Sequence, residues 1–466
     1  MLWRVFIVFG ACAVALLALV WVIPKIVRYI IGQQVKQAMT RLFTEPYTKN
    51  LLEGATALSK FGLLNTVENE LRSEQAEVLL KPIGTNRPFP HFDGLLFSSA
   101  QLHRKALNHS IPVTVTTVLG RRAKRPMILS IPIMTSAMGY GVALNKPFVR
   151  ALAKGTAAAG TALNTGQGPV LPEFRDLAHR LVVQYHGAPW RPEEDTLRVA
   201  DMIEIRFGQG ANAGCGAMVY NKDITAEIAR DMGGADMGGT DHPSQDFYIP
   251  AGFPGIYKPH ELRELVEQLR ALGRGAPIAL KLAAGNDLEA DIKFAIQADI
   301  DVLVLDGAQG GTHSSSAILV DDFGIPTLAA LCRAQRFLKH HGLRDRLDLV
   351  ISGGIRTPGD VLKALALGAD AVYMGTGALF AATHTQISKA IPFEPPTQLA
   401  WAAGQMKDQF DEDEGSRTLA NFLISCTEEL KMGARALGKT SVHDVDAQDL
   451  VAWDPEASRI TGIPLV

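Results

Sequence analysis

The feature that most constrains the fold is a repeated alternation of short apolar segments with helical patterns, from Met127 to about residue 375. The apolar segments are nearly continuous, which is typical of parallel strands buried on both faces. Several of the stretches between them have helical spacing, and Pro259–Leu272 and Pro358–Leu367 begin with Pro and are followed by Gly. This alternation predicts an α/β fold, a (β/α)8 TIM barrel. The expected strands are Met127–Thr135, Ala158–Asn164, Arg180–Tyr185, Met202–Phe207, Ile278–Ala283, Val302–Asp306, Leu347–Ser352 and Ala371–Gly375.

Length and composition agree with one large domain that has extensions. The chain has 466 residues, of which 47% are apolar, enough to bury a large core. The formal net charge is −2, and there is no basic stripe interleaved with aromatics, so we expect no nucleic-acid partner. The four cysteines form no CxxC pair, and no metal site is predicted.

The flanks of the barrel are helical in pattern. We expect four parts: an anchor at 1–31, a helical lead-in and connecting segment at 32–126, the barrel at 127–390, and a C-terminal helical extension packed on the barrel at 391–466. Ser416–Leu437 is predicted to be an amphipathic helix with Ser416 as a possible cap. The charge run Asp411–Glu414 before it is interpreted as solvated.

The N-terminus carries an apolar run. Val5–Ile23 contains 19 residues without a charge and would span about 28 Å as a helix. Lys25 and Arg28 follow it, so the positive-inside rule predicts a single-pass protein of the inner membrane. The lipid bilayer would contact residues 5–23, and the barrel would face the cytoplasm. The alternatives are a cleaved signal peptide and a buried core helix; a signal peptide usually ends in small residues, whereas this run ends in bulky ones.

One connection is unusually long. Residues 209–277 separate the fourth and fifth expected strands and contain a Gly-rich stretch near Gly233. Long loops in compact domains are usually functional. This one leaves the carboxyl end of a strand, where barrel active sites are built, so a substrate-covering role is expected over a plain insertion.

Glycine pairs follow the last two strands. Gly353 and Gly354 follow the seventh, and Gly375-Thr376-Gly377 follows the eighth. Such loops bring bare backbone N–H groups to a phosphate, and a helix beginning there adds its positive end. The plain alternative is that the glycines only make tight turns. Two such loops on adjacent strands favour a phosphate site.

Charged residues interrupt two of the apolar strands. Lys281 lies inside the fifth strand, where a charge must be paired or serve a ligand. Glu204 and Arg206 alternate with apolar neighbours on the fourth strand, so both are expected to point into the barrel. A structural ion pair among these residues is the alternative interpretation. Asp306 and Thr312 add polar groups after the sixth strand, and polar groups thus converge on one end of the barrel.

These motifs together resemble a known family, the FMN-binding, substrate-reducing domain of glutamate synthase, and the resemblance runs from about Phe92 to the C-terminus. It also extends to shorter, stand-alone members. It is carried, in order, by Pro132–Gly141, Asn164–Gly168, Glu204–Ala211, Lys281, Asp306–Thr312, Ser352–Gly354 and Gly375–Gly377.

The resemblance implies FMN at the mouth of the barrel and a small-molecule substrate. In that family, reduced flavin passes a hydride to 2-iminoglutarate, made from 2-oxoglutarate and ammonia, to give glutamate. By motif, Gly353, Gly354, Gly375, Thr376 and Gly377 would hold the FMN phosphate. Ser136, Met138 and Gln184 would lie along the flavin, and Lys281 would face its pyrimidine edge. The predicted catalytic residues are Lys281 and Glu204, and the predicted substrate-binding residues are Gln209, Gly310, Gly311 and Thr312.

The chain departs from full-length glutamate synthases in two places. The expected membrane helix stands where those proteins carry a glutaminase domain. Residues 378–386 contain no cysteine, so no [3Fe–4S] cluster is expected and the electron donor is unknown. Two alternatives stay open. One is FMN-dependent oxidation of another small amino or hydroxy acid. The other is a non-catalytic, membrane-tethered flavin-binding subunit.

Overall fold

The computed structural model describes residues 2–233 and 246–466, with side chains from residue 18 onward. The chain divides into two compact units, Met1–Leu79 and Leu80–Val466, which are described separately. This division differs from the expected boundaries at residues 31, 126 and 390. The second half of the expected lead-in and the whole C-terminal extension belong to the same unit as the barrel.

The first unit consists of helices. The helices are α1 (Leu2–Thr44), α2 (Leu51–Phe61) and α3 (Leu63–Gln75), with one short 3-10 turn (Tyr47–Lys49) before α2. Asn50 caps α2, because its side-chain oxygen accepts from the Leu52 N–H at 2.9 Å. Gly62 has a φ of +87° and separates α2 from α3.

The expected membrane anchor is not supported. Residues 5–17 of the apolar run lie outside the residues whose side chains are described. In the described part of the chain, no helix is both long enough and apolar enough to cross a membrane. The helix that contains the run continues to Thr44 and carries Lys25, Arg28 and Arg41. The prediction of a single-pass inner-membrane protein is therefore corrected.

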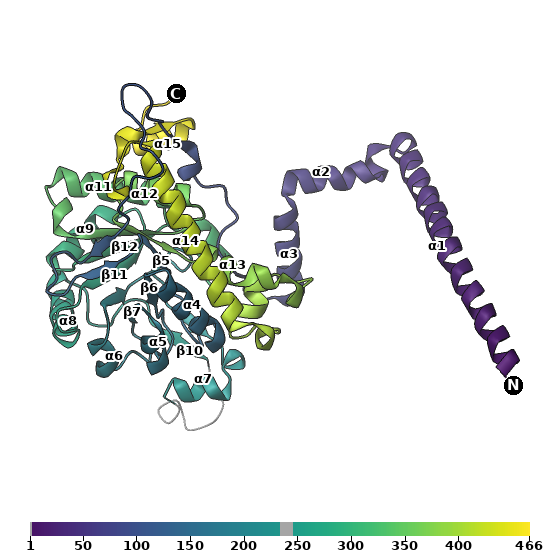
Figure 1. Ribbon diagram of the computed structural model, residues 1–466, viewed down its shortest axis with the longest axis horizontal. Coiled ribbons are helices and arrows are strands. Elements are labelled where there is room, and N and C mark those ends of the chain that lie inside the picture. The colour runs from purple at the N-terminus through teal and green to yellow at the C-terminus, as the bar shows by residue number, and fades with distance from the viewer. Residues whose placement is uncertain (1, 234–245) are drawn as a thin grey trace. The chain divides into compact units, whose positions relative to one another are not determined.

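The second unit is built on a parallel barrel (Figure 1). Its eight-stranded sheet, counted over the described residues, has the order β5-β15-β14-β12-β11-β8-β7-β6, so strands that are consecutive in the barrel repeat are neighbours in space. The TIM-barrel prediction is confirmed. The strands are β5 (Ile133–Thr135), β6 (Ala162–Asn164), β7 (Arg180–Tyr185), β8 (Met202–Arg206), β11 (Ile278–Ala283), β12 (Val302–Asp306), β14 (Asp348–Ser352) and β15 (Ala371–Met374).

Threonine side chains complete the closure between β5 and β6. The Thr135 hydroxyl donates to the Ala162 carbonyl at 3.2 Å, and the Thr161 hydroxyl donates to the Ile133 carbonyl at 2.6 Å. Both threonines are buried, so these bonds form away from water. They join the first and last strands of the sheet order.

A hairpin closes the amino-terminal end of the barrel. The expected first strand, 127–135, is split in two: β4 (Met127–Leu129) pairs antiparallel with β3 (Thr117–Leu119), and only β5 enters the barrel. Leu119, Met127 and Leu129 pack in one buried cluster with inward-facing barrel side chains such as Val182 and Val350. The chain leaves the strand conformation at residues 130–132. One apolar stretch therefore forms both the floor of the barrel, through β4, and one of its strands, β5.

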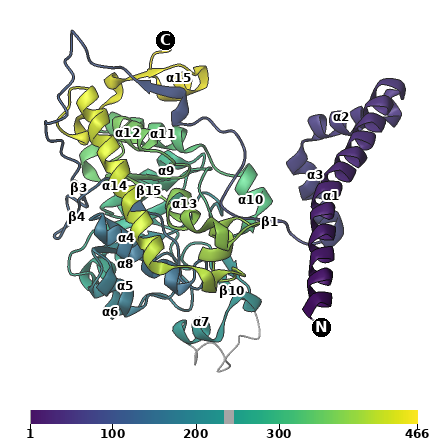
Figure 2. The same ribbon diagram turned by 45° about the vertical axis from the view of Figure 1, so that its right-hand side comes forward.

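Helices surround the barrel (Figures 1 and 2). They are α4 (Lys146–Ala158), α5 (Pro172–Leu177), α6 (Glu194–Arg198), α8 (Pro259–Leu272), α9 (Leu288–Gln297), α10 (Ala317–Asp322), α11 (Thr327–His340), α12 (Pro358–Ala366) and α13 (Thr376–Thr383). The boundaries of α8 match the expected helix, and those of α12 match it to within one residue.

The long helix α14 (Glu412–Ala436) packs along α4 on the outside of the barrel (Figure 2). Its cap is Asp411 rather than Ser416, since the Asp411 carboxylate accepts from the Glu414 N–H at 2.9 Å. The charge run is also not simply solvated: Glu412 forms ion pairs with Arg150 at 3.0 Å and Lys154 at 2.6 Å. These pairs attach the start of α14 to α4.

Both flanking segments return to the barrel unit. β16 (Leu450–Ala452) pairs antiparallel with β2 (Leu95–Phe97), which joins the C-terminal extension to the lead-in; α15 (Pro455–Thr461) follows. Within the long connection, β9 (Ala217–Val219) pairs with β10 (Phe247–Ile249), and α7 (Ala226–Asp231) lies between them. Residues 234–245 of the expected substrate-covering loop lie outside the described residues.

Candidate active site

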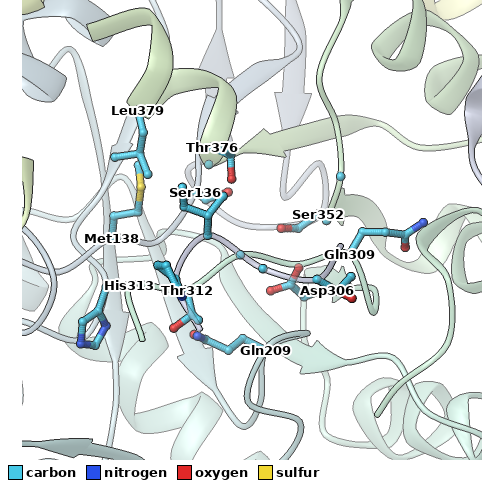
Figure 3. A pocket seen from close by; sticks show the side chains of 18 of the residues that line it. Ser136, Met138, Gln209, Asp306, Gln309, Thr312, His313, Ser352, Thr376 and Leu379 are labelled. Carbon is cyan, nitrogen blue, oxygen red and sulfur yellow. The ribbon is translucent and has the colours of Figure 1, made fainter. Parts of the chain in front are cut away.

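A cavity of about 910 Å³ lies at the carboxyl ends of the barrel strands. Figure 3 shows its labelled side chains around a common space, with Leu379, Met138 and His313 on one side and Asp306, Ser352 and Gln309 on the other. The volume falls in the range of small-molecule and cofactor sites. Parallel strands of a barrel end at this face, so loops distant in sequence meet here.

Lys281 on β11 projects into the cavity wall and is 3% exposed. Its ammonium Nζ lies 3.5 Å from the Asp306 carboxylate on β12 and 5.9 Å from the centre of the Tyr373 ring. The second Asp306 oxygen, Oδ1, has no hydrogen-bond partner among the described residues. A buried lysine held by one carboxylate, with an oxygen still unsatisfied beside it, is the arrangement expected where a polar ligand completes the site.

Glu204 on β8 is fully buried and is not among the residues that line the cavity. Its Oε1 accepts from Asn164 Nδ2 at 3.0 Å and from Gln184 Nε2 at 2.7 Å. Its Oε2 accepts from the Tyr373 hydroxyl at 2.9 Å. Burial, and then the Glu204 charge, raises the pKa of Tyr373 well above its ordinary value, so the phenol stays a donor.

The network around Glu204 orients two residues that do line the cavity. Gln184 and Tyr373 both border it and both donate to Glu204. Because the Gln184 amide NH2 is used in this way, its carbonyl oxygen is the group left for a ligand. Glu204 therefore holds Gln184 and Tyr373 in position and does not itself reach the cavity.

The two glycine loops after β14 and β15 lie on the cavity. Gly353 and Gly354 have φ values of +106° and +72°, a region that favours glycine. A Cβ on Gly354 would lie 2.8 Å from the Gln309 Cβ. Gly375 precedes the eight-residue helix α13 and, with Thr376, also lines the cavity, whereas Gly377 does not. Four of the five residues expected to hold a phosphate therefore lie together.

Residues of the lead-in also reach this loop, which the sequence did not reveal. His91 Nε2 lies 2.7 Å from the Gly354 carbonyl, and Arg356 donates to His91 Nδ1 at 2.9 Å. Nδ1 is therefore the acceptor, and Nε2–H donates to Gly354. Burial lowers the pKa of His91, which keeps this neutral form. Asp93 and Asp360 lie beside His91, but Arg356 also donates to Asp93, so this cluster is an ion-pair network.

A second part of the lead-in, residues 81–89, borders the cavity as well. β1 (Leu80–Lys81) pairs antiparallel with β13 (Ser315–Ser316), just after the loop that contains Thr312. Lys81 and Thr85 bind the two oxygens of Asp321, at 2.7 and 2.8 Å. The Pro-rich stretch from Pro82 to Pro90 belongs to the segment that was expected only as a lead-in and connection. Its turn residues were a usable signal for a functional loop.

The remaining predicted site residues are mostly brought together. Ser136, Met138, Gln184, Gln209, Gly311 and Thr312 all line the cavity. Gly310 does not; its N–H donates to the Gly307 carbonyl at 2.8 Å, and a Cβ there would meet Asp306 Oδ1 at 2.7 Å. Gly310 therefore allows the loop after β12 to pack closely against Asp306 and against the backbone of Gly210.

The fold and the site define a (β/α)8-barrel protein with a ligand cavity at the carboxyl ends of its strands, the usual position of a barrel enzyme's active site. Residues 97–440 match the family described as the conserved region in glutamate synthase. The chain therefore belongs to the glutamate synthase family.

Individual proteins agree with this assignment. The chain is 35% identical over 408 residues to the glutamate synthase large subunit-like protein of Rhizobium meliloti, a match that covers 83% of this chain and 90% of that protein. It is 28% identical over 397 residues to the archaeal-type glutamate synthase [NADPH] of Thermotoga sp., covering 80% and 76% respectively. The solved flavin-binding domain of baker's yeast flavocytochrome b2 has the same fold, with a TM-score of 0.50 and 15% identity over 79% of this chain and 80% of that one.

Proposed function

We propose that the protein is an FMN-dependent oxidoreductase that reduces an imino acid, 2-iminoglutarate formed from 2-oxoglutarate and ammonia, to the amino acid. The observation that carries this proposal is that one cavity holds both a glycine-lined phosphate cradle and the buried Lys281. Membership of the glutamate synthase family supports the choice of reaction.

The residues present fit FMN. A phosphate needs backbone N–H groups that no side chain obstructs, and Gly354, Gly375 and Thr376 line the cavity where α13 begins. A Cβ on Gly354 would collide with Gln309, so this part of the cradle depends on glycine. At the same time, the unsatisfied Asp306 oxygen and the buried Lys281 offer polar partners to a heterocycle.

When bound and reduced, FMN would supply the substrate with two electrons and a proton in the form of a hydride. Lys281 would supply a positive charge to the bound group, where it would stabilise negative charge on the reduced flavin. Gln184, fixed through Glu204, would offer its carbonyl oxygen to a donor of the bound group. Met138 and Leu379 provide an apolar wall (Figure 3), which excludes water from the reacting centre.

The substrate would lie on the side of Gln209 and Thr312. Both line the cavity, and Figure 3 shows them next to each other. Their amide and hydroxyl groups can donate to carboxylate oxygens or accept from an imino N–H. Gly311 lets the backbone approach the ligand closely at this position.

Two glycine variants test the FMN site. Gly354→Ala introduces a positive-φ alanine and a contact with Gln309 at 2.8 Å. Gly342→Ala imposes the same backbone strain, with a φ of +66°, but its Cβ would meet nothing within 4 Å. We expect Gly354→Ala to weaken FMN binding at least about 10-fold and Gly342→Ala to leave it unchanged, although each loses about 1 kcal/mol of stability.

The measurement is fluorescence titration of apoprotein with FMN, accompanied by thermal unfolding of each variant. Equal FMN affinity in both variants would remove the assigned role of the Gly353–Gly354 loop. A wild-type protein that does not bind FMN at all would remove the proposed function itself.

A further inference from the structure

A second buried cation lies close to the cavity, and none of the described carboxylates forms an ion pair with it. Arg206, the last residue of β8, is 2% exposed, and no ion pair involves it among the described residues. Its Nη2 has no hydrogen-bond partner there either. Glu204, on the same strand, is occupied by Asn164, Gln184 and Tyr373. Asp306 lies 3.5 Å from Lys281 instead.

Because Arg206 is buried, water does not screen its positive charge, and a ligand that binds next to it would feel that charge strongly. Desolvation lowers the pKa of Arg206 to about 10, an effect that the Asp306 charge opposes only in part. The same cation, after burial, helps to lower the pKa of His186 to about 3, so the neighbouring imidazole is neutral. Of these two neighbouring residues, Arg206 is therefore the one that carries a positive charge.

Gln167 is the residue that connects Arg206 to the cavity. Its side-chain oxygen accepts from Arg206 Nε at 3.2 Å and from Nη1 at 3.1 Å. This orientation is assigned, because the opposite one would place the amide NH2 against two guanidinium donors. Gln167 lines the cavity, and its backbone carbonyl is fixed by the Trp190 indole N–H at 2.7 Å. With its oxygen facing Arg206, its NH2 group is left for a ligand.

Unsatisfied polar atoms gather on this wall. Buried atoms of His186, Arg206 and Asn212 lack partners among the described residues; His186 directly follows β7, Arg206 ends β8, and Asn212 lies in the loop after β8. Native proteins leave few buried polar groups unsatisfied, so a group of them beside a cavity indicates a polar ligand.

We propose that Gln167, held by Arg206, binds a carboxylate of the substrate, with the amide NH2 donating to the carboxylate and Arg206 supplying the offsetting charge. This inference rests on the proposed function, since it names the part of the substrate that this wall recognises. It also makes Arg206 a positioning residue, which acts through Gln167.

The variant Gln167→Glu tests this proposal, because it is expected to keep or raise the unfolding temperature while it weakens the binding of 2-oxoglutarate. The new carboxylate would form a bidentate ion pair with Arg206, so the protein should unfold at a temperature no lower than that of the wild type. The same carboxylate removes the donor and repels an anion. We therefore expect 2-oxoglutarate, measured by calorimetry on the FMN-loaded protein, to bind at least about 10-fold more weakly.

Three comparisons make the result specific. Gln167→Met removes the NH2 without adding charge and should also weaken 2-oxoglutarate binding, which keeps the test intact if Gln167→Glu does not fold. Gln101→Glu adds the same charge at an exposed position away from the cavity and should change nothing. The neutral dimethyl ester of 2-oxoglutarate should bind equally to the wild type and Gln167→Glu.

Wild-type affinity for 2-oxoglutarate in Gln167→Glu would overturn the proposal, as would a wild-type protein that does not bind this dicarboxylate. If the wild type does not bind FMN, but Gln167→Glu still weakens the binding of 2-oxoglutarate measured without FMN, the proposed function is refuted and the carboxylate site stands.

Discussion

Buried charges at the carboxyl end of the barrel are stabilised by different means. Glu204 accepts from three uncharged donors, Lys281 has Asp306, and Arg206 has the amide oxygen of Gln167. The sequence predicted that charges interrupting apolar strands would converge, because alternation fixes which side chains face inward. It could not predict these partners, since they come from strands and loops far apart in the chain.

His186 gives a prediction about pH at this scale. Burial, then Arg206, lowers its pKa from an ordinary 6.5 to about 3, so it is neutral in the fold and protonates below pH 6.5 only on unfolding. Its contribution to stability is therefore present above pH 6.5 and is lost as pH falls. Between about pH 7 and about pH 5 the loss from this group is about 2 kcal/mol.

His186→Asn isolates this effect. Its side-chain oxygen can still accept from the Ala188 N–H, which His186 Nδ1 accepts at 3.3 Å, but it does not titrate. Urea unfolding at the two pH values should show a stability loss about 2 kcal/mol smaller in the variant than in the wild type. Parallel losses in the two proteins would mean that His186 is protonated in the folded state.

Most strands and several helices follow from local pattern, and the exceptions have physical causes. Seven expected strands appear within a few residues of their predicted bounds, because apolar runs and turn residues mark them. The first expected strand divides, since β4 pairs with β3 rather than with the barrel. Antiparallel pairing across the floor depends on a partner segment that periodicity alone does not identify.

The floor hairpin provides a matched pair of variants. Leu129 is fully buried in the barrel floor, whereas Ile128, its neighbour on β4, is 51% exposed. Leu129→Ala should cost about 2–5 kcal/mol of unfolding free energy, because it leaves a cavity among the inward-facing side chains. Ile128→Ala should cost less than about 1 kcal/mol. Chemical denaturation that gave equal losses for the two would contradict the assignment of this hairpin as a packed floor.

At the scale of the whole molecule, the sequence identified the barrel and the family but misjudged the flanks. A membrane anchor was inferred from an apolar run, and the described helices do not support it. Conversely, the lead-in was assigned no role, yet residues 81–93 border the cavity or hold its glycine loop. Those contacts join segments more than 200 residues apart, so the turn residues could mark a loop here but not show which segments it contacts.

The division into two units predicts the effect of truncation. Every residue that lines the cavity belongs to the unit that begins at Leu80. Deleting residues 2–76 should therefore leave FMN affinity within about twofold of the full chain, with the same unfolding transition of the barrel. Fluorescence titration and calorimetric unfolding measure both. A truncated protein that folds but no longer binds FMN would show that the first unit contributes to the site.

The most direct test of the central claim is an anaerobic half-reaction. FMN-loaded protein is reduced chemically and then mixed with 2-oxoglutarate and ammonium while the visible flavin absorbance is followed. Our account predicts reoxidation of the flavin with one glutamate formed per flavin, and no reoxidation when either component is omitted. Flavin that stays reduced in the presence of both would contradict the proposed reaction.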